Sequence, residues 1–249
     1  MSKGLRFEDI EFRYRRGSPP IFRRFSFDTG EGRCVLLGPN GAGKSTLLGI
    51  GANALTPNRG SVRLDGRTPR GRRQTSAYRA DVGWMPQVVR PIPGLTAREQ
   101  VAYAGWLKGM SRAEAWAAAD PALASVQLTG LEGRTVTSLS GGQLRRVGLA
   151  QVLVHRPRVM LLDEPTAGLD PAQRSQFRLI LRALAPDVSF LISTHQVDDL
   201  NMAFERVAVL SGGRIAFEGD IEQFLNLAPR DSKHPGEDAY LRLIGGGEH

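Results

Sequence analysis

The 249-residue sequence contains little cysteine and no long hydrophobic run. Its single cysteine, Cys34, leaves neither a disulfide framework nor a zinc site available, which fits a reducing compartment. No stretch reaches the roughly 18 to 20 apolar residues that cross a bilayer, and the N-terminus has no apolar signal region. We therefore expect a soluble, cytoplasmic protein.

Lysine is also scarce, so arginine carries most of the formal net charge of +8. A positive balance permits binding to nucleic acid or to acidic membrane surfaces but requires neither. The arginines are scattered along the chain, which favours a solvated surface over a dedicated polyanion site. The four lysines are Lys3, Lys44, Lys108 and Lys233.

A glycine-rich segment follows the apolar run Cys34–Leu37 and opens a predicted helix. The segment fits the pattern G-x-x-x-x-G-K-[ST], in which backbone N–H groups cradle phosphates while a lysine and a hydroxyl reach different parts of one ligand. The chain is therefore predicted to bind a nucleoside triphosphate. The residues of this phosphate loop are Gly38, Pro39, Asn40, Gly41, Ala42, Gly43, Lys44, Ser45 and Thr46.

The apolar patterns predict an α/β fold with a P-loop NTPase core and a mostly parallel sheet. Residues 5–37 alternate apolar and polar side chains, which indicates an antiparallel β subdomain before the phosphate loop. Residues 157–163 and 188–194 are nearly continuous apolar runs, as in buried parallel strands. Before these two runs lies a helical insertion, about 88–154, in which Ser111 and Glu114 form a capping box.

Shorter elements complete the predicted organisation. Residues 60–66 suggest a hairpin strand, followed by a basic loop through Arg79 and another short strand at 81–87. We expect one ATPase domain over 1–219 and a short C-terminal tail over 220–249 that begins with a helix.

Two adjacent carboxylates, Asp163 and Glu164, end the apolar strand at 159–163. Successive side chains on a strand point in opposite directions, so one carboxylate can serve a Mg²⁺ shell while the other faces an attacking water. This pair is weak evidence alone, and its value comes from the motifs that accompany it. They are Gln87, the sequence Leu-Ser-Gly-Gly-Gln at 139–143, Ala-Gly-Leu-Asp at 167–170 and Thr-His at 194–195.

Together these motifs resemble the nucleotide-binding subunits of ABC transporters, and the resemblance runs from Leu5 to about Gly219. The signature sequence at 139–143 places a hydroxyl and bare N–H groups at a helix start, a second anion site without a lysine. In the family this anion site binds a phosphate of the ATP that a partner subunit holds. The resemblance therefore implies a head-to-tail homodimer. The signature residues carried over for nucleotide contact are Ser140, Gly141, Gly142 and Gln143.

The resemblance also implies roles around the phosphates. Lys44 and the backbone of residues 41–46 hold the β- and γ-phosphates, Ser45 binds Mg²⁺ and Thr46 reaches the α-phosphate. Asp163 and Gln87 complete the metal shell, with Gln87 also linking to the helical insertion.

The remaining implied roles concern hydrolysis and the adenine. Glu164 is the expected catalytic base, His195 the switch histidine that contacts the γ-phosphate, and Asp170 a residue that communicates between the two sites. Tyr14 stands where the family stacks an aromatic ring on adenine, although Tyr14 could also be an ordinary strand residue.

Softer similarities point to exporters of the ABC-2 group, whose ATPase is a separate polypeptide. They lie at residues 91–99, 107–109 and 237–243, the last resembling a short terminal helix. The expected partners are integral membrane permease subunits at the inner face of the cell membrane, without nucleic acid. An importer subunit is the nearest competitor.

A different class is a soluble ABC ATPase that acts on ribosomes or DNA, which a basic protein would suit. Translation-type members carry two cassettes, whereas this chain has one. DNA-repair members separate the two motifs by long coiled coils, whereas Lys44 and Ser140 lie 96 positions apart here.

Overall fold

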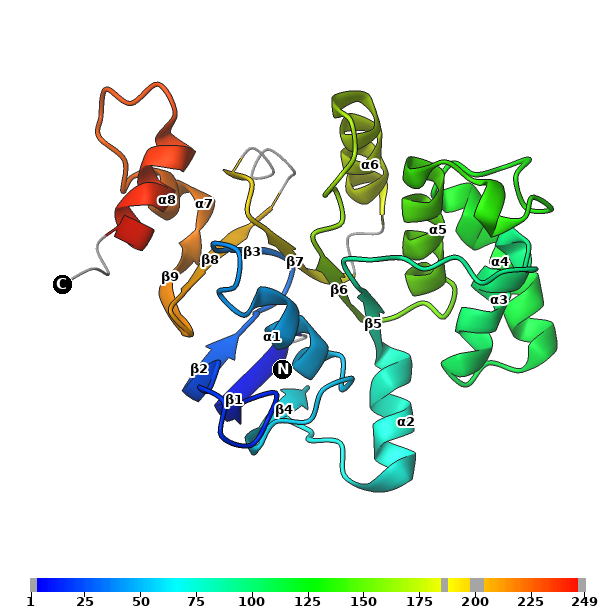
Figure 1. Cartoon of the computed structure of the whole chain (residues 1–249), viewed down its shortest axis with the longest axis horizontal. Helices are drawn as coiled ribbons and strands as arrows, with labels where there is room; N and C mark the ends of the chain where they lie inside the picture. The colour runs from blue at the N-terminus through cyan, green and yellow to red at the C-terminus, as the bar shows by residue number, and fades with distance from the viewer. Residues whose placement is uncertain (1–3, 185–187, 198–203, 246–249) are drawn as a thin grey trace.

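The structure, a computed structural model, describes residues 4–184, 188–197 and 204–245 and contains two sheets (Figure 1). The smaller sheet is antiparallel, in the order β2 (Phe22–Asp28), β1 (Leu5–Phe12) and β4 (Arg59–Leu64). The larger sheet is parallel except for its last strand. Its order is β5 (Val82–Met85), β6 (Val159–Asp163), β7 (Ser189–Thr194), β3 (Arg33–Leu37), β8 (Arg206–Ser211) and β9 (Arg214–Asp220).

Both faces of the larger sheet are buried at its central strands β6, β7, β3 and β8, which explains their apolar runs without polar alternation. On β3, Cys34 and Leu36 join a core with the smaller sheet and α1 (Lys44–Gly51), whereas Val35 and Leu37 join a second core with the helical insertion. The prediction that Cys34 lies in a buried strand is confirmed, and burial raises the pKa of its thiol to about 12.

The helical insertion consists of α3 (Ala97–Leu107), α4 (Arg112–Ser125) and α5 (Gly141–Leu153), which lie together at the right of Figure 1. The predicted capping box of Ser111 and Glu114 is confirmed at the start of α4. Thr96 and Glu99 form the same arrangement at the start of α3, from a Thr-x-x-Glu pattern that the sequence also shows. Local hydrogen bonds therefore set where these helices begin.

The prediction of a basic loop through Arg79 is wrong, because residues Gly71–Asp81 form the helix α2. The helix is polar on nearly all sides, and Tyr78 is its one buried side chain. The Tyr78 hydroxyl donates to the Gly51 carbonyl at 2.5 Å, and Arg79 Nη2 donates to the Asn53 carbonyl at 2.7 Å. Contacts with the end of α1 and the residues just after it therefore hold α2 in place. The polar composition of residues 71–81 does not by itself predict a helix.

The C-terminal part packs against the far edge of the larger sheet. Strands β8 and β9 were not predicted, although the Gly212-Gly213 turn between them, with φ angles of 55° and 75°, is a hairpin signal. The helices α7 (Ile221–Leu225) and α8 (Pro235–Gly245) cover these strands and bury Phe224 and Ala239. The predicted short helix and terminal helix are confirmed. Among the described residues no helix is both long and apolar enough for a membrane span.

Candidate nucleotide-binding and hydrolysis site

The phosphate loop connects β3 to α1 as the sequence predicts. Gly43 begins α1 with a φ of 103°, and a Cβ on Gly38 would lie 2.4 Å from the Leu210 carbonyl oxygen, so both positions require glycine. The Lys44 amine is buried and donates to the carbonyls of Gly38 at 2.7 Å and Pro39 at 3.1 Å. Burial lowers the pKa of Lys44, and the charges of Glu164 and Asp163 oppose this shift.

Three predicted site residues converge on the buried carboxylate of Glu164. Its Oε1 lies 3.6 Å from Lys44 Nζ, and its Oε2 lies 3.2 Å from His195 Nδ1 and accepts from Gln87 Nε2 at 3.4 Å. Glu164, His195 and Gln87 follow the ends of β6, β7 and β5. The carboxyl ends of parallel strands share one edge of a sheet, so sequence-distant residues meet there.

Ser193 orders the two carboxylates, and the sequence interpretation missed it. Its hydroxyl donates to Asp163 Oδ1 at 2.6 Å and accepts from the Glu164 N–H at 3.0 Å. Glu164 has a φ of 44°, a left-handed conformation that costs a non-glycine residue free energy and persists where neighbours hold it. The signal available in the sequence was a polar pair, Ser193 and Thr194, at the end of an apolar run.

A hollow of about 630 Å³ extends from the phosphate loop to the helical insertion. Ser45, Gln87 and Asp163 line the end nearest the loop, and Ala104 and Leu107 of α3 line the other end. Hydroxyl, amide and carboxylate oxygens are hard ligands that suit Mg²⁺, which commonly takes one or two protein groups together with phosphate oxygens. These residues therefore fit the predicted metal.

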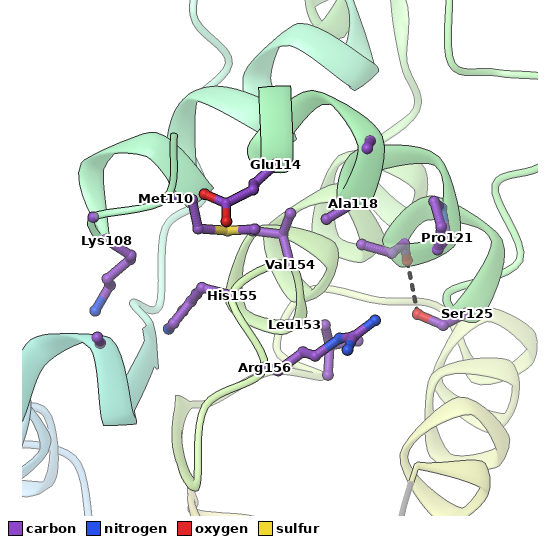
Figure 2. Close-up of a pocket in the computed structure, with 14 residues that line it drawn as sticks. Lys108, Met110, Glu114, Ala118, Pro121, Ser125, Leu153, Val154, His155 and Arg156 are labelled. Carbon is purple, nitrogen blue, oxygen red and sulfur yellow. Dashed lines mark hydrogen bonds between the residues drawn. The ribbon is translucent and has the colours of Figure 1, made fainter. Parts of the chain in front are cut away.

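A second hollow, about 740 Å³, lies between the α3–α4 turn, α4 and the end of α5 (Figure 2). Lys108, Glu114, His155 and Arg156 line it, and its described lining contains no predicted site residue. Burial, assisted by the nearby charge of Lys108, lowers the pKa of His155 to about 4. This hollow is the larger of the two and adjoins the first, since Lys108 and His155 line both.

Tyr14 lies beside the start of α1. Its hydroxyl is 3.0 Å from Thr46 Oγ1, and Phe12 packs edge-on against its ring at a centroid distance of 5.0 Å. The side of the residue away from these contacts is open, since Tyr14 is 60% exposed. Its stacking role stays a prediction.

The signature sequence starts α5, and Ser140 caps that helix. The Ser140 hydroxyl accepts from the Gln143 N–H at 3.2 Å, which leaves its hydrogen free to donate to a ligand. Gly141 is exposed with open space around it, whereas a Cβ on Gly142 would meet Gln173 of α6 (Pro171–Ala183). Asp170 caps α6 by accepting from the Gln173 N–H at 2.8 Å.

Within one chain the signature and phosphate loop do not meet. Figure 1 shows α5 with α3 and α4 on one side of β5 and β6, and α1 on the other side. The structure thus assembles Lys44, Gln87, Glu164 and His195 around one point, and leaves Ser140 at a separate surface.

Comparison with known proteins identifies this arrangement. A family model described as ABC transporter matches residues 22–167, more than half of the chain. The chain belongs to the ABC transporter family. Its site is therefore that of an ABC ATPase, and the phosphate loop, the strand end at Asp163 and the signature lie within the matched region.

Similar ABC proteins include exporters and importers. An uncharacterised ABC transporter ATP-binding protein, YxlF of Bacillus subtilis, is 34% identical over 81% of this chain, which spans 66% of that protein. The Nod factor export ATP-binding protein I of Paraburkholderia xenovorans is 37% identical over 86% of this chain and 70% of its own length. The cobalt import ATP-binding protein CbiO of Rhodobacter capsulatus is 41% identical over 74% and 67%.

Solved ABC cassettes share the fold. The cassette MJ0796, solved as a dimer in a post-hydrolysis state bound to ADP and Pi, superposes with a TM-score of 0.77 at 26% identity. The match covers 87% of this chain and 98% of that cassette. The predicted α/β class, with an antiparallel N-terminal sheet and a mostly parallel core, is confirmed.

Proposed function

We propose that this ABC ATPase is a transporter subunit that closes head to tail with a second copy over two ATP molecules and drives export through separate integral membrane subunits. The observation that carries the proposal is the separation of the signature from a hydrolysis site that is otherwise gathered within the chain. Lys44, Gln87 and His195 all meet Glu164, whereas Ser140 caps α5, which lies across β5 and β6 from α1. A second copy would supply the missing signature.

In this proposal the phosphate loop and Lys44 bind the β- and γ-phosphates, and Thr46 reaches the α-phosphate. Ser45, Asp163 and Gln87 would hold Mg²⁺, which neutralises developing charge on the phosphate oxygens when bound. The amine of Lys44 now bonds loop carbonyls and lies near Glu164, so an arriving phosphate would offer it a stronger anionic partner.

Hydrolysis then depends on positioning a water between Glu164 and the γ-phosphate. An ionised Glu164 carboxylate accepts a proton from that water as the water attacks phosphorus. His195, 3.2 Å from Glu164 Oε2, and Gln87, 3.4 Å from it, orient the carboxylate and lie where they can contact the water.

The dimer supplies the second half of each site. Ser140 and the N–H groups of Gly141 and Gly142 would bind the γ-phosphate on the partner, helped by the positive end of the α5 dipole. Asp170, which caps the neighbouring helix α6, would connect the two sites. The dimeric MJ0796 cassette supports this assembly.

Replacing Glu164 with glutamine tests the assignment. Glu164→Gln keeps the shape and hydrogen bonding of the side chain but cannot accept the proton, so we expect ATP turnover to fall at least about 100-fold. ATP should then hold the chain as a dimer, measured by size exclusion with light scattering. A variant that stays monomeric in ATP while turning over normally would refute the proposed base.

A capping control separates binding from helix stability. In the Glu164→Gln background, Ser140→Ala and Ser111→Ala each remove one capping box, at a similar cost of about 1 kcal/mol. Only the Ser140→Ala change should abolish the ATP-dependent dimer, because Ser111 caps α4 away from the site. If both changes weakened the ATP-dependent dimer equally, Ser140 would act only as a helix cap and not as a ligand of ATP.

Export and a position at the inner face of the cell membrane complete the proposal. Export rests on the similarity of residues 91–99 and 107–109 to ABC-2 exporters and is consistent with the Nod factor export relative. The hollow that joins Gln87 to α3 is where we place the contact with a membrane subunit. ATP-driven motion at Gln87 would reach the partner through this region.

A further inference from the structure

Arg145 is buried in α5, two residues after the signature, and its guanidinium contacts both loops of the hydrolysis site. Its Nε donates to the Pro165 carbonyl at 2.9 Å, and its Nη2 donates to the Glu164 carbonyl. Its Nη1 donates to the Gln87 carbonyl. One side chain thus ties the signature helix to the main chain of two predicted site residues.

The chemistry of this contact requires arginine. Burial lowers the pKa of Arg145 while the charges of Asp163 and Glu164 raise it, and a guanidinium remains protonated even when desolvated. Its planar fork holds donors in fixed directions and reaches carbonyls from two separate loops. A lysine carries the charge but concentrates its donors on one flexible atom, so it cannot reproduce this geometry.

The contact also secures an unusual backbone conformation. Glu164 has a φ of 44°, and its N–H and its carbonyl are both hydrogen-bonded. The Glu164 N–H donates to the hydroxyl and carbonyl of Ser193, and the Glu164 carbonyl accepts from Arg145 and from the Ala167 N–H. Of these partners, Arg145 alone comes from α5, so its position is the route by which that helix can affect the direction of the Glu164 side chain.

We propose that Arg145 is a positioning residue that couples the signature helix to the Glu164 and Gln87 of its own chain. The inference rests on the proposed dimer, in which the start of α5 binds the partner's nucleotide. A movement of α5 on that nucleotide shifts Arg145 and, through the three carbonyls, reorients Glu164. Occupancy of one site thus governs hydrolysis at the other.

The test compares Arg145→Lys with Arg146→Lys. Arg146 is the next residue of α5, but its guanidinium donates to the carbonyls of Val126 and Gln127, away from Glu164. For Arg145→Lys we expect kcat to fall at least 10-fold, the KM for ATP to change less than 2-fold and the Hill coefficient for ATP to approach 1. Arg146→Lys should keep the kcat and Hill coefficient of the original chain.

A second variant guards against misfolding. Arg145→Gln leaves no buried cation and should give the same loss of kcat and cooperativity, with fluorescent ATP binding as the check of folding. In the Glu164→Gln background, Arg145→Lys should still form the ATP-dependent dimer. If that dimer forms while Arg145→Lys and Arg145→Gln turn over ATP cooperatively at the original rate, the coupling role is overturned and the proposed function stands. If the Glu164→Gln variant alone never dimerises in ATP, both the coupling role and the proposed function are overturned.

Discussion

At the scale of single residues, burial decides how the ionisable side chains behave. Lys44 and His155 both have lowered pKa values because burial disfavours their charged forms, but Lys44 also has two carboxylates beside it. His155 instead lies near the positive charge of Lys108, which adds to the effect of burial. Neighbouring charges therefore oppose the lowered pKa of Lys44 and reinforce the lowered pKa of His155.

His155 makes stability depend on pH. Its pKa is about 4 in the folded chain against the ordinary histidine value of 6.5, so below about pH 6.5 the unfolded chain takes up a proton that the folded chain does not. The free energy of unfolding should therefore fall as pH drops from 6.5 to 4, by roughly 2 to 3 kcal/mol from this residue. Urea unfolding of the original chain and His155→Gln at pH 5 and pH 7 measures the difference.

His234 provides the control, because it is an exposed histidine outside both hollows. His155→Gln should flatten the pH dependence, whereas His234→Gln should leave it unchanged. An identical slope in the original chain and His155→Gln would show that His155 titrates normally.

At the scale of elements, helices start where short capping patterns place them but persist where tertiary contacts hold them. Thr96, Ser111 and Ser140 each start a helix with the same reciprocal side-chain arrangement. Helix α2 has no side-chain cap and depends on Tyr78 and Arg79 for its position. Local capping therefore sets the start of α3, α4 and α5, whereas long-range hydrogen bonds position α2.

Removing the Tyr78 hydroxyl should loosen α2. Tyr78→Phe leaves the Gly51 carbonyl without its 2.5 Å donor, and an unsatisfied buried carbonyl costs about 1 to 3 kcal/mol. We expect a lower unfolding free energy in urea with ATP turnover little changed, because α2 lies outside the site. Tyr103→Phe, at an exposed position of α3, is the matched control. Equal stability of the two variants would show that the hydroxyl does not anchor α2.

At the scale of the whole molecule, the larger sheet separates two cores and presents its catalytic edge between them. The core around α1 carries the phosphate loop, and the core around α3, α4 and α5 carries the signature. Arg145 reaches from the second core to that edge. Movements of the helical insertion therefore have a direct route to Glu164.

Purification from the native cell tests the assembly of the whole molecule. The tagged chain, extracted in mild detergent, should bring an integral membrane protein in near one-to-one ratio, because we place the permease contact at the Gln87 hollow. Mass spectrometry identifies the partner, and an unrelated tagged ATPase is the control. Ribosomes or nucleic acid in place of a membrane protein would move the function to the soluble branch of the family.

Much of the site could be predicted because its motifs are short and their spacing is demanding. The phosphate loop, the strand end at Asp163 and the Gln87 and His195 positions all lie where local sequence places them, at the ends of strands. Ser193 and Arg145 were missed because a buried serine or arginine reveals its partners only after distant segments pack together. The roles of Tyr14 and Asp170 stay predictions because they concern contacts with a nucleotide and with a second subunit.

The sequence by itself determined the family, the nucleotide loop and the buried strands β3, β6 and β7, because each depends on contiguous residues. Only the tertiary structure decided that Gln87, Lys44 and His195 meet at Glu164, that a basic segment forms α2, and that Arg145 joins the signature helix to the catalytic edge. These features depend on hydrogen bonds between residues far apart in the chain, whose partners exist only when the sheet and its two cores have assembled.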